Sequence, residues 1–155
     1  MNLPTTQLIV FRLAPGTSLE GGMLGALERV EANTSLRIVD VLFARRTAEA
    51  GDLEVVTGDN SSGALAAAAI EFRLDETARR EGSARALEAH PELGQLADAL
   101  EPGAAVAAVL VEHRWLAGFA EEVARTGGEA ARSEFTDATA VRELLPQLVD
   151  SVKSR

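Results

Sequence analysis

Residues 36–57 read LRIVDVLFARR (36–46), TAEAGD (47–52) and LEVVT (53–57), and the predicted fold is built around this stretch. Branched and aromatic residues dominate its two outer parts, which is typical of β-strands, and the segment between them contains a glycine followed by an aspartate. Two apolar runs joined by a short turn predict a β-hairpin. We therefore predict strands at 36–46 and 53–57 that pair antiparallel.

An apolar run at 7–13 precedes this hairpin, and Pro15 and Gly16 end it. Its branched residues are continuous rather than alternating, as in a central strand that is buried on both faces. Ser18 is a candidate helix N-cap, and apolar residues recur after it at helical spacing. We predict a buried central strand at 7–13 and a helix at 19–30.

Helical patterns and a further strand follow the hairpin. Residues 64–101 have helical character that Pro91 interrupts, which predicts a helical hairpin or a kinked pair of helices rather than one rod. Residues 104–111 predict a strand, and residues 114–126 predict a helix that ends at a Gly-Gly pair.

Two more elements are predicted near the C-terminus. Residues 129–135 suggest a short, polar fifth strand, and residues 137–152 suggest a last helix that Pro146 kinks or shortens. The resulting order, β-α-β-β-α(α)-β-α-β-α, matches the ferredoxin-like βαββαβ pattern over its first six elements. That pattern predicts an antiparallel sheet with helices on one face.

We therefore predict a single α+β domain at 1–155. Its ferredoxin-like core occupies residues 1–112 with an inserted helical hairpin at 61–101, and a helix-strand-helix extension occupies residues 113–155. The chain has 155 residues, 15 Lys and Arg, 24 Asp and Glu, a net charge of −9 and no cysteine. A disulfide scaffold and a thiolate metal site are excluded because both need cysteine.

The acidic balance, with no basic cluster longer than a pair, argues against binding to nucleic acid. No apolar run approaches the roughly 20 residues that a membrane-spanning helix needs, and no secretory signal is recognisable. The composition therefore predicts a cytoplasmic protein without a transmembrane span.

Several stretches resemble an uncharacterised actinobacterial family of unknown function, often described as membrane-associated. The carrying residues are LIVF at 8–11, the glycine-bearing first helix, RIVDVLFARR at 37–46 with the Gly-Asp pair at 51–52, and VLVEHRW at 109–115. Residues 63–70 resemble that family's glycine-rich hydrophobic hairpin, at a length that cannot span a bilayer. The resemblance implies a ferredoxin-like domain over much of the chain and implies no activity.

Asp40 is a carboxylate within an otherwise apolar strand. Period-two alternation places it on one face with Ile38 and Leu42. A buried carboxylate is costly unless it is paired, so a functional role would be that of a site acid or of a partner for an arginine. The alternative, which we favour, is an exposed charge or a charge that guards an edge strand against aggregation.

The densest polar and aromatic cluster is Glu112-His113-Arg114-Trp115, where a strand is predicted to run into a helix. His113 is a candidate general base with Asp40 or Glu112 as its orienting acid, and Trp115 is a candidate anchor for a partner. Charged residues are also ordinary at the ends of elements. We therefore favour a solvated helix start with a half-buried tryptophan.

Arg45 belongs to one of the two arginine pairs of the chain, which are candidates for contact with phosphate or with an acidic partner. We favour solvated arginines or surface ion pairs of small value. The two histidines lack metal-ligand spacing, and no glycine-rich stretch forms a phosphate-binding loop. No catalytic residue, metal or cofactor is therefore predicted. The candidate binding residues are Asp40, Arg45, His113, Arg114 and Trp115.

We expect a non-catalytic protein that acts through self-association or through a protein partner. Ferredoxin-like sheets leave open edges and a face that need a partner. One alternative is a small-molecule-binding protein or enzyme with a pocket between sheet and helices near Asp40 and His113. Another, suggested by the family resemblance, is a peripheral membrane or stress-associated protein, although the acidic charge opposes binding to anionic lipid.

Overall fold

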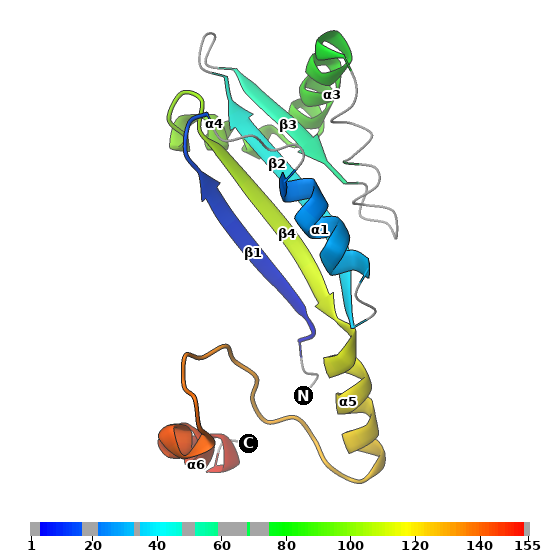
Figure 1. Ribbon diagram of the computed structural model, residues 1–155, viewed down its shortest axis with the longest axis vertical. Helices are drawn as coiled ribbons and strands as arrows, with labels where there is room; N and C mark the ends of the chain where they lie inside the picture. The colour runs from blue at the N-terminus through cyan, green and yellow to red at the C-terminus, as the bar shows by residue number, and fades with distance from the viewer. Residues whose placement is uncertain are drawn as a thin grey trace. The chain divides into compact units, whose positions relative to one another are not determined.

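The computed structural model describes residues 4–16, 22–32, 35–47, 52–58, 68 and 75–153. These residues form an α+β fold (Figure 1). In chain order the elements are β1 (Thr6–Leu13), α1 (Gly22–Ala32), β2 (Leu36–Arg46), β3 (Leu53–Thr57), α3 (Glu76–Ala89), α4 (Gly94–Ala99), β4 (Ala105–His113), α5 (Arg114–Arg125) and α6 (Leu145–Lys153). Short 3₁₀ turns occupy Pro91–Leu93 and Val141–Leu144. Ser18, the predicted N-cap, lies outside the described residues. The part of the predicted helical region 64–101 that precedes residue 75 also lies outside them, apart from Ala68.

The chain divides into two compact units. Residues Thr6–Glu112 form the first, here named the sheet unit, and Met1–Thr5 together with His113–Arg155 form the second, here named the terminal unit. The sheet unit contains the strands apart from the last residue of β4, together with α1, α3 and α4. The terminal unit contains α5 and α6.

The sheet has four strands in the order β1-β4-β2-β3, and neighbouring strands run antiparallel. β2 and β3 form the predicted hairpin, in which Leu42 lies opposite Thr57 and Arg46 lies opposite Leu53. The predicted α+β class and antiparallel sheet are thus confirmed. This strand order does not establish the ferredoxin-like arrangement, which stays a prediction.

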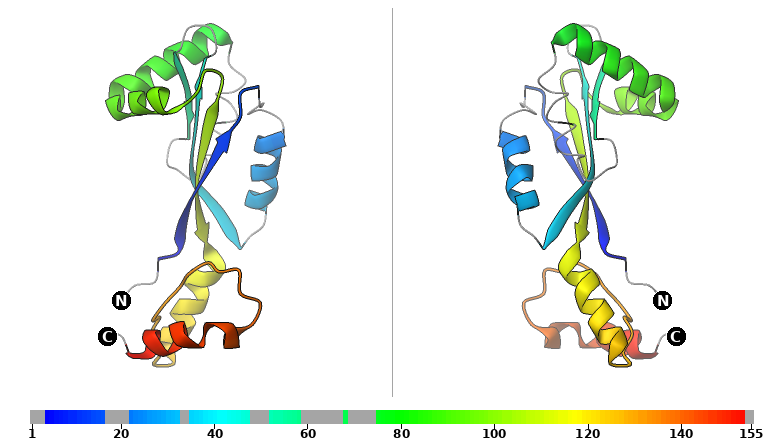
Figure 2. Two further views of the ribbon diagram at one scale, coloured as in Figure 1. Left: turned by 90° about the vertical axis from the view of Figure 1, so that its left-hand side faces the viewer. Right: turned by 90° about the vertical axis from the view of Figure 1, so that its right-hand side faces the viewer.

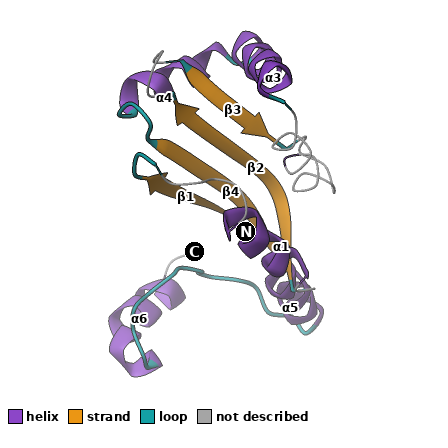
Figure 3. Cartoon of the chain, turned by 45° about the horizontal axis from the view of Figure 1, so that its top comes forward, coloured by secondary structure: helices purple, strands orange, loops and turns teal. Residues whose placement is uncertain are grey.

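β1 lies at one edge of the sheet, so the prediction of a buried central strand at 7–13 is wrong (Figure 3). The inner position belongs to β4, which pairs with β1 from Thr6 opposite Glu112 to Leu13 opposite Ala105. β4 is rich in alanine, and small side chains such as Ala105 allow a covering layer to approach the strand closely. A continuous apolar run identifies a strand but does not reveal whether both of its faces are covered.

Helices cover both faces of the sheet, although one covered face was predicted (Figure 2). On the first face, Leu27 and Val30 of α1 pack against a core of Ile38, Val41, Phe43, Val56, Ala68, Ala105, Ala107, Val109 and Val111. On the second face, α3, α4 and the residues between and just after them cover Ala44, Leu53 and Val55. Phe43 and Ala44 are neighbours in β2 and belong to different cores, which places the two cores on opposite faces.

α3 begins and ends at residues that the sequence marks. The Asp75 carboxylate accepts a hydrogen bond from the Ala78 N–H at 2.8 Å and so caps the helix N-terminus. The helix ends at Ala89, shortly before Pro91, and α4 follows as a separate helix. The predicted break of the helical region at Pro91 is therefore confirmed.

Ser83 of α3 closes the outer edge of β3. The Val55 N–H donates to Ser83 Oγ at 2.9 Å, and Ser83 Oγ donates to the Val55 carbonyl at 3.2 Å. Ser83 is only 5% exposed, so both bonds form away from solvent. Although β3 is an edge strand, these backbone groups of Val55 are satisfied by a helix that lies beside it.

The terminal unit matches the sequence in α5 but not after it. α5 covers the predicted helix, and Gly127 follows it with a φ of 91°, a left-handed conformation that favours glycine. The predicted strand at 129–135 is wrong: these residues have no regular secondary structure. They are mostly exposed, and no strand within the described ranges accepts their backbone hydrogen bonds.

The last helix is shorter than predicted. α6 begins at Leu145 rather than at residue 137, after a 3₁₀ turn over Val141–Leu144. Pro146 is the second residue of α6, where its missing N–H leaves no intrahelical bond unmade. Pro146 therefore lies at the start of a shortened helix, which agrees with one of the two predicted alternatives, and it does not kink the helix.

Candidate functional site

The five predicted binding residues are divided between the two units. Asp40 and Arg45 lie on β2 in the sheet unit. His113 is the last residue of β4, and Arg114 and Trp115 begin α5, so these three residues belong to the terminal unit. Asp40 and His113, which the predicted pocket would share, thus belong to different units.

The alternation of faces along β2 breaks beside Asp40. Ile38, Val41 and Phe43 all belong to the core under α1, whereas Leu42 packs in the opposite core. Ile38 and Val41 are three positions apart, so one extra residue lies between them, as in a β-bulge. The prediction that Ile38 shares a face with Leu42 is therefore wrong. Asp40 Oδ1 accepts a hydrogen bond from the Val41 N–H at 2.9 Å, so this carboxylate is held by its own strand.

Arg45 lies among charges of both signs. It is opposite Glu54 in the β2–β3 register and is partly buried. Glu54 also forms an ion pair with Arg79 of α3, with 3.5 Å between the carboxylate and the guanidinium. The surroundings of Arg45 are therefore mixed in charge rather than a basic patch that would attract phosphate.

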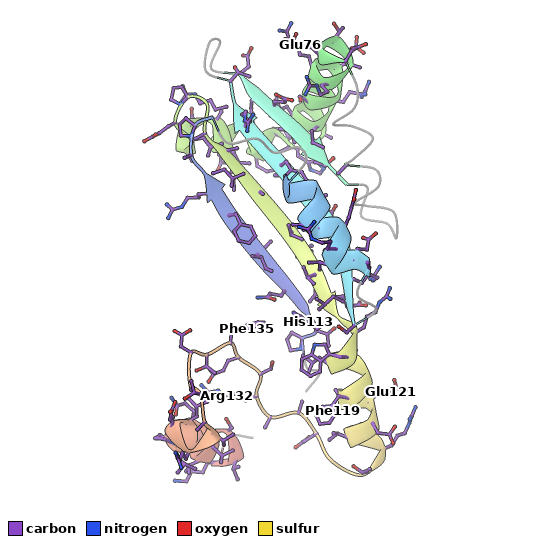
Figure 4. The ribbon with its side chains drawn as sticks, viewed as in Figure 1. Glu76, His113, Phe119, Glu121, Arg132 and Phe135 are labelled. Carbon is purple, nitrogen blue, oxygen red and sulfur yellow. The ribbon has the colours of Figure 1, made fainter. Side chains whose placement is uncertain are left out.

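His113 joins the strand to the helix that follows it. Its backbone N–H donates to the Thr5 carbonyl at 2.8 Å, and its ring centroid lies 6.1 Å from that of Phe135 at a tilt of 49° (Figure 4). No side-chain hydrogen bond from His113 caps α5. Trp115, in the first turn of α5, is 55% exposed, and a large exposed aromatic side chain suits a partner anchor.

Sequence reasoning missed an ion pair that joins β2 to β4. Arg37 Nε and Nη2 each lie 3.4 Å from one carboxylate oxygen of Glu112, and both side chains are about one-third exposed. Glu112 is part of the cluster that the sequence singles out, but its partner is 75 positions away in the chain. Only the pairing of strands brings the two residues together, so no local pattern could have revealed the contact.

A cavity of about 650 Å³ lies between α3 and the β2–β3 hairpin. Its charged lining residues are Asp52, Glu54, Glu76, Arg79 and Arg80. These charges include two ion pairs, Arg80 with Glu76 at 2.6 Å and Arg79 with Glu54 at 3.5 Å. None of the five predicted binding residues lines this cavity.

β1 exposes apolar side chains along an open strand edge. Leu8, Val10 and Phe11 are 61%, 55% and 52% exposed, and within the described ranges no strand pairs with the outer side of β1. Leu8 and Val10 point to one face of the sheet and Phe11 points to the other. These three side chains and the outer backbone of β1 are named the β1 edge surface.

The hydrogen-bond pattern shows which residues of β1 face the open side. The bond from the His113 N–H to the Thr5 carbonyl extends the β1–β4 ladder by one residue. Bonded and non-bonded pairs alternate along an antiparallel ladder, so the odd-numbered residues of β1 direct their backbone groups towards β4. The even-numbered residues direct theirs outwards. These residues are Thr6, Leu8, Val10 and Arg12.

The terminal unit exposes apolar helix faces of its own. On α5, Phe119 follows Trp115 by one helical turn, and both side chains are exposed. Figure 4 labels Phe119 on this helix. On α6, the exposed residues Leu145, Leu148, Val149 and Val152 follow the spacing of an amphipathic helix. The sequence predicts the helical spacing but not the exposure of these side chains.

Comparison of the chain with protein-family models, with curated proteins and with solved structures finds no match. Among the helices that the structure describes, none is long and apolar enough to cross a membrane. The described residues also contain no group of three or more His, Cys, Asp or Glu that could hold a metal ion. In the sheet unit, the two candidate sites are the β1 edge surface and the cavity beside α3.

Proposed function

We propose that this protein acts by binding rather than by catalysis and that it self-associates through the β1 edge surface. One observation carries the proposal: exposed Leu8, Val10 and Phe11 lie on a strand whose outer side is unpaired within the described residues. Proteins protect such edges with charges, proline, bulges or covering segments, because an open apolar edge pairs with other strands. β1 contains one charged residue, Arg12, and no proline.

Light scattering coupled to size-exclusion chromatography tests this proposal. We expect the wild-type protein to have the mass of at least two chains, and Val10→Lys to shift it towards one chain, because a lysine on an edge strand opposes pairing. Val152→Lys is the matched control, since it makes the same change at an exposed valine of α6.

A single-chain mass for the wild type at high protein concentration would refute self-association. Equal loss of association in Val10→Lys and Val152→Lys would show that the β1 edge surface is not the contact. Val10 is more than half exposed, so the lysine should not disturb the core, and circular dichroism verifies that both variants fold.

The cavity beside α3 supports a second candidate function, the binding of a small molecule. Its volume of about 650 Å³ lies within the range of typical ligand sites, and Arg79 and Glu76 supply charges of both signs. Native mass spectrometry tests this candidate. We expect a retained small molecule that Arg79→Met releases and that Arg85→Met, a change on the same helix outside the cavity lining, does not. Absence of any bound mass would remove this candidate. The pocket predicted near Asp40 and His113 stays a prediction.

A further inference from the structure

We propose that two copies of this chain pair antiparallel through β1 about a two-fold axis, so that their two sheets join into one continuous sheet with Ile9 at the axis. The inference rests on the proposed function, and it names the partner and the strand register at the same surface. A two-fold contact is self-complementary, so each interaction across it occurs twice. β1 must therefore match its own sequence read in the opposite direction.

Backbone geometry leaves few registers for such a pair. The even-numbered residues of β1 direct their N–H and C=O groups outwards, so bonded pairs across the axis join even to even. Two registers keep most of the strand paired. With Ile9 at the axis, Leu8 lies opposite Val10 of the second copy. With Val10 at the axis, Leu8 lies opposite Arg12 of the second copy.

On the face of β1 that carries Leu8 and Val10, side-chain matching favours the register with Ile9 at the axis. Leu8 and Val10 are exposed on the same face of β1, and this register places each against the other across the axis, twice. Their apolar surface is then removed from water. The other register places Leu8 opposite the charged side chain of Arg12 and pairs Val10 only with itself. On the opposite face it places Phe11 against Ile9, whereas the register with Ile9 at the axis places Phe11 against Gln7. The choice of register therefore rests on Leu8, Val10 and Arg12.

Charge matching favours the same register. Arg12 then lies opposite Thr6 of the second copy, and within each sheet Thr6 lies opposite Glu112. Arg12 and Glu112 of the second copy are therefore two strands apart, about 9.6 Å between Cα atoms at a strand spacing of about 4.8 Å. Extended arginine and glutamate side chains together span that distance.

The resulting row of charges alternates in sign. Glu112 already faces Arg37 at 3.4 Å, and Arg12 of the second copy would approach the same carboxylate from its other side. β1 itself contains no acidic residue. The contact thus brings together two chains of net charge −9 through a segment that is apolar and carries one positive charge.

Disulfide mapping tests this register, because the chain has no cysteine and each introduced thiol is the only one. Full-length Leu8→Cys and Val10→Cys chains are mixed in equal amounts, oxidised mildly and analysed by mass spectrometry. We expect the mixed Leu8→Cys/Val10→Cys disulfide to be the predominant product. A bonded antiparallel pair has a Cα separation of about 5.5 Å, which a disulfide can bridge.

A second variant and a control complete the test. Ile9→Cys alone should form a disulfide with itself, since Ile9 is at the axis in a non-bonded pair about 4.5 Å apart. Val152→Cys mixed with Val10→Cys is the control, because Val152 is exposed but lies outside the β1 edge surface. This mixture should give no preferred mixed product.

The possible outcomes separate this inference from the proposed function. A predominant Val10→Cys disulfide with itself would establish the other register and overturn the inference. Absence of all β1 disulfides in a protein that light scattering shows to be dimeric would overturn pairing through β1 but leave self-association standing. A monomeric wild type would overturn both.

Discussion

The two edge strands of the sheet, β3 and β1, are both rich in apolar residues, but they differ in how well their outer edges are covered. Val55 of β3 is 2% exposed, and both of its outward backbone groups are bonded to Ser83 of α3. Val10 of β1 is 55% exposed, and its outward backbone groups face no strand of the described chain. Apolar residues make up five of the eight residues of β1 and three of the five residues of β3.

This difference shows that edge protection in this protein comes from a neighbouring helix and not from the strand's own sequence. α3 covers β3, supplies a hydroxyl to Val55 and pairs its Arg79 with Glu54 of β3. β1 has no such cover from the described elements of the sheet unit. A second copy of β1 would supply the hydrogen bonds and the apolar contacts that α3 supplies to β3.

The largest expected effect distinguishes a covered phenylalanine from an uncovered one. Phe43→Ala should lower the free energy of unfolding by about 3–5 kcal/mol, because Phe43 is 1% exposed between β2 and α1 and its loss leaves a cavity. Phe11→Ala, at 52% exposure, should cost less than about 1.5 kcal/mol. Urea denaturation measures both. Equal losses would show that the side chains of β1 are covered as well as those of β2.

The next largest loss of stability is expected when the hydroxyl that closes the β3 edge is removed. Ser83→Ala should cost about 1–3 kcal/mol, because it leaves the Val55 N–H and carbonyl without their hydroxyl partner in a buried place. The matched change is Ser151→Ala, whose hydroxyl donates to the Gln147 carbonyl within its own helix. That variant should stay within about 0.5 kcal/mol of the wild type, as surface substitutions usually do. If Ser83→Ala and Ser151→Ala lower the free energy of unfolding equally, the Ser83 hydroxyl does not close the β3 edge.

A smaller loss of stability is expected when the ion pair between β2 and β4 is removed, because this pair links the β2–β3 hairpin to the β1–β4 pair of strands. Arg37→Met should cost about 0.2–1 kcal/mol, because it removes the ion pair that joins β2 to Glu112 of β4 at one-third exposure. Arg80→Met removes an ion pair within α3 that is about three-quarters exposed, so its effect should be close to zero. Chemical denaturation compares the two. A larger loss for Arg80→Met would contradict a linking role for Arg37.

The smallest effect concerns charge at the open edge. Arg12→Glu should raise the dissociation constant of self-association about 1.5- to 5-fold, in line with the small value of an exposed ion pair. Arg85→Glu changes the net charge equally on an exposed face of α3, so it controls for general repulsion. Analytical ultracentrifugation measures both constants. An equal change in the two variants would remove Arg12 from the contact.

The elements with strong local signals agree with the sequence. The β2–β3 hairpin, the break at Pro91 and helix α5 depend on residue type and spacing over a few neighbours, and all three occur as predicted. Segment 129–135 shows the limit of such signals. It has some strand character, but a strand exists only where a second strand accepts its hydrogen bonds, and none does so within the described residues.

The candidate site was less predictable than the fold. Trp115 is exposed at the start of α5, where the sequence places a candidate anchor. The β1 edge surface was missed, because the near absence of charge in 7–13 also suits a strand buried on both faces. The Arg37–Glu112 pair was missed because the sequence has no local signal for a contact between distant strands.

Local sequence alone determined the extents of β2, β3 and α5, because backbone preference and side-chain spacing act over a few residues. Tertiary structure alone decided that β1 is an edge strand, that helices cover both faces and that Ser83 closes the β3 edge. Those features depend on which distant segments meet. The hydrophobic effect is non-directional, so an apolar side chain can be buried by a helix of its own chain or by a strand of another, and its pattern in the sequence does not distinguish the two.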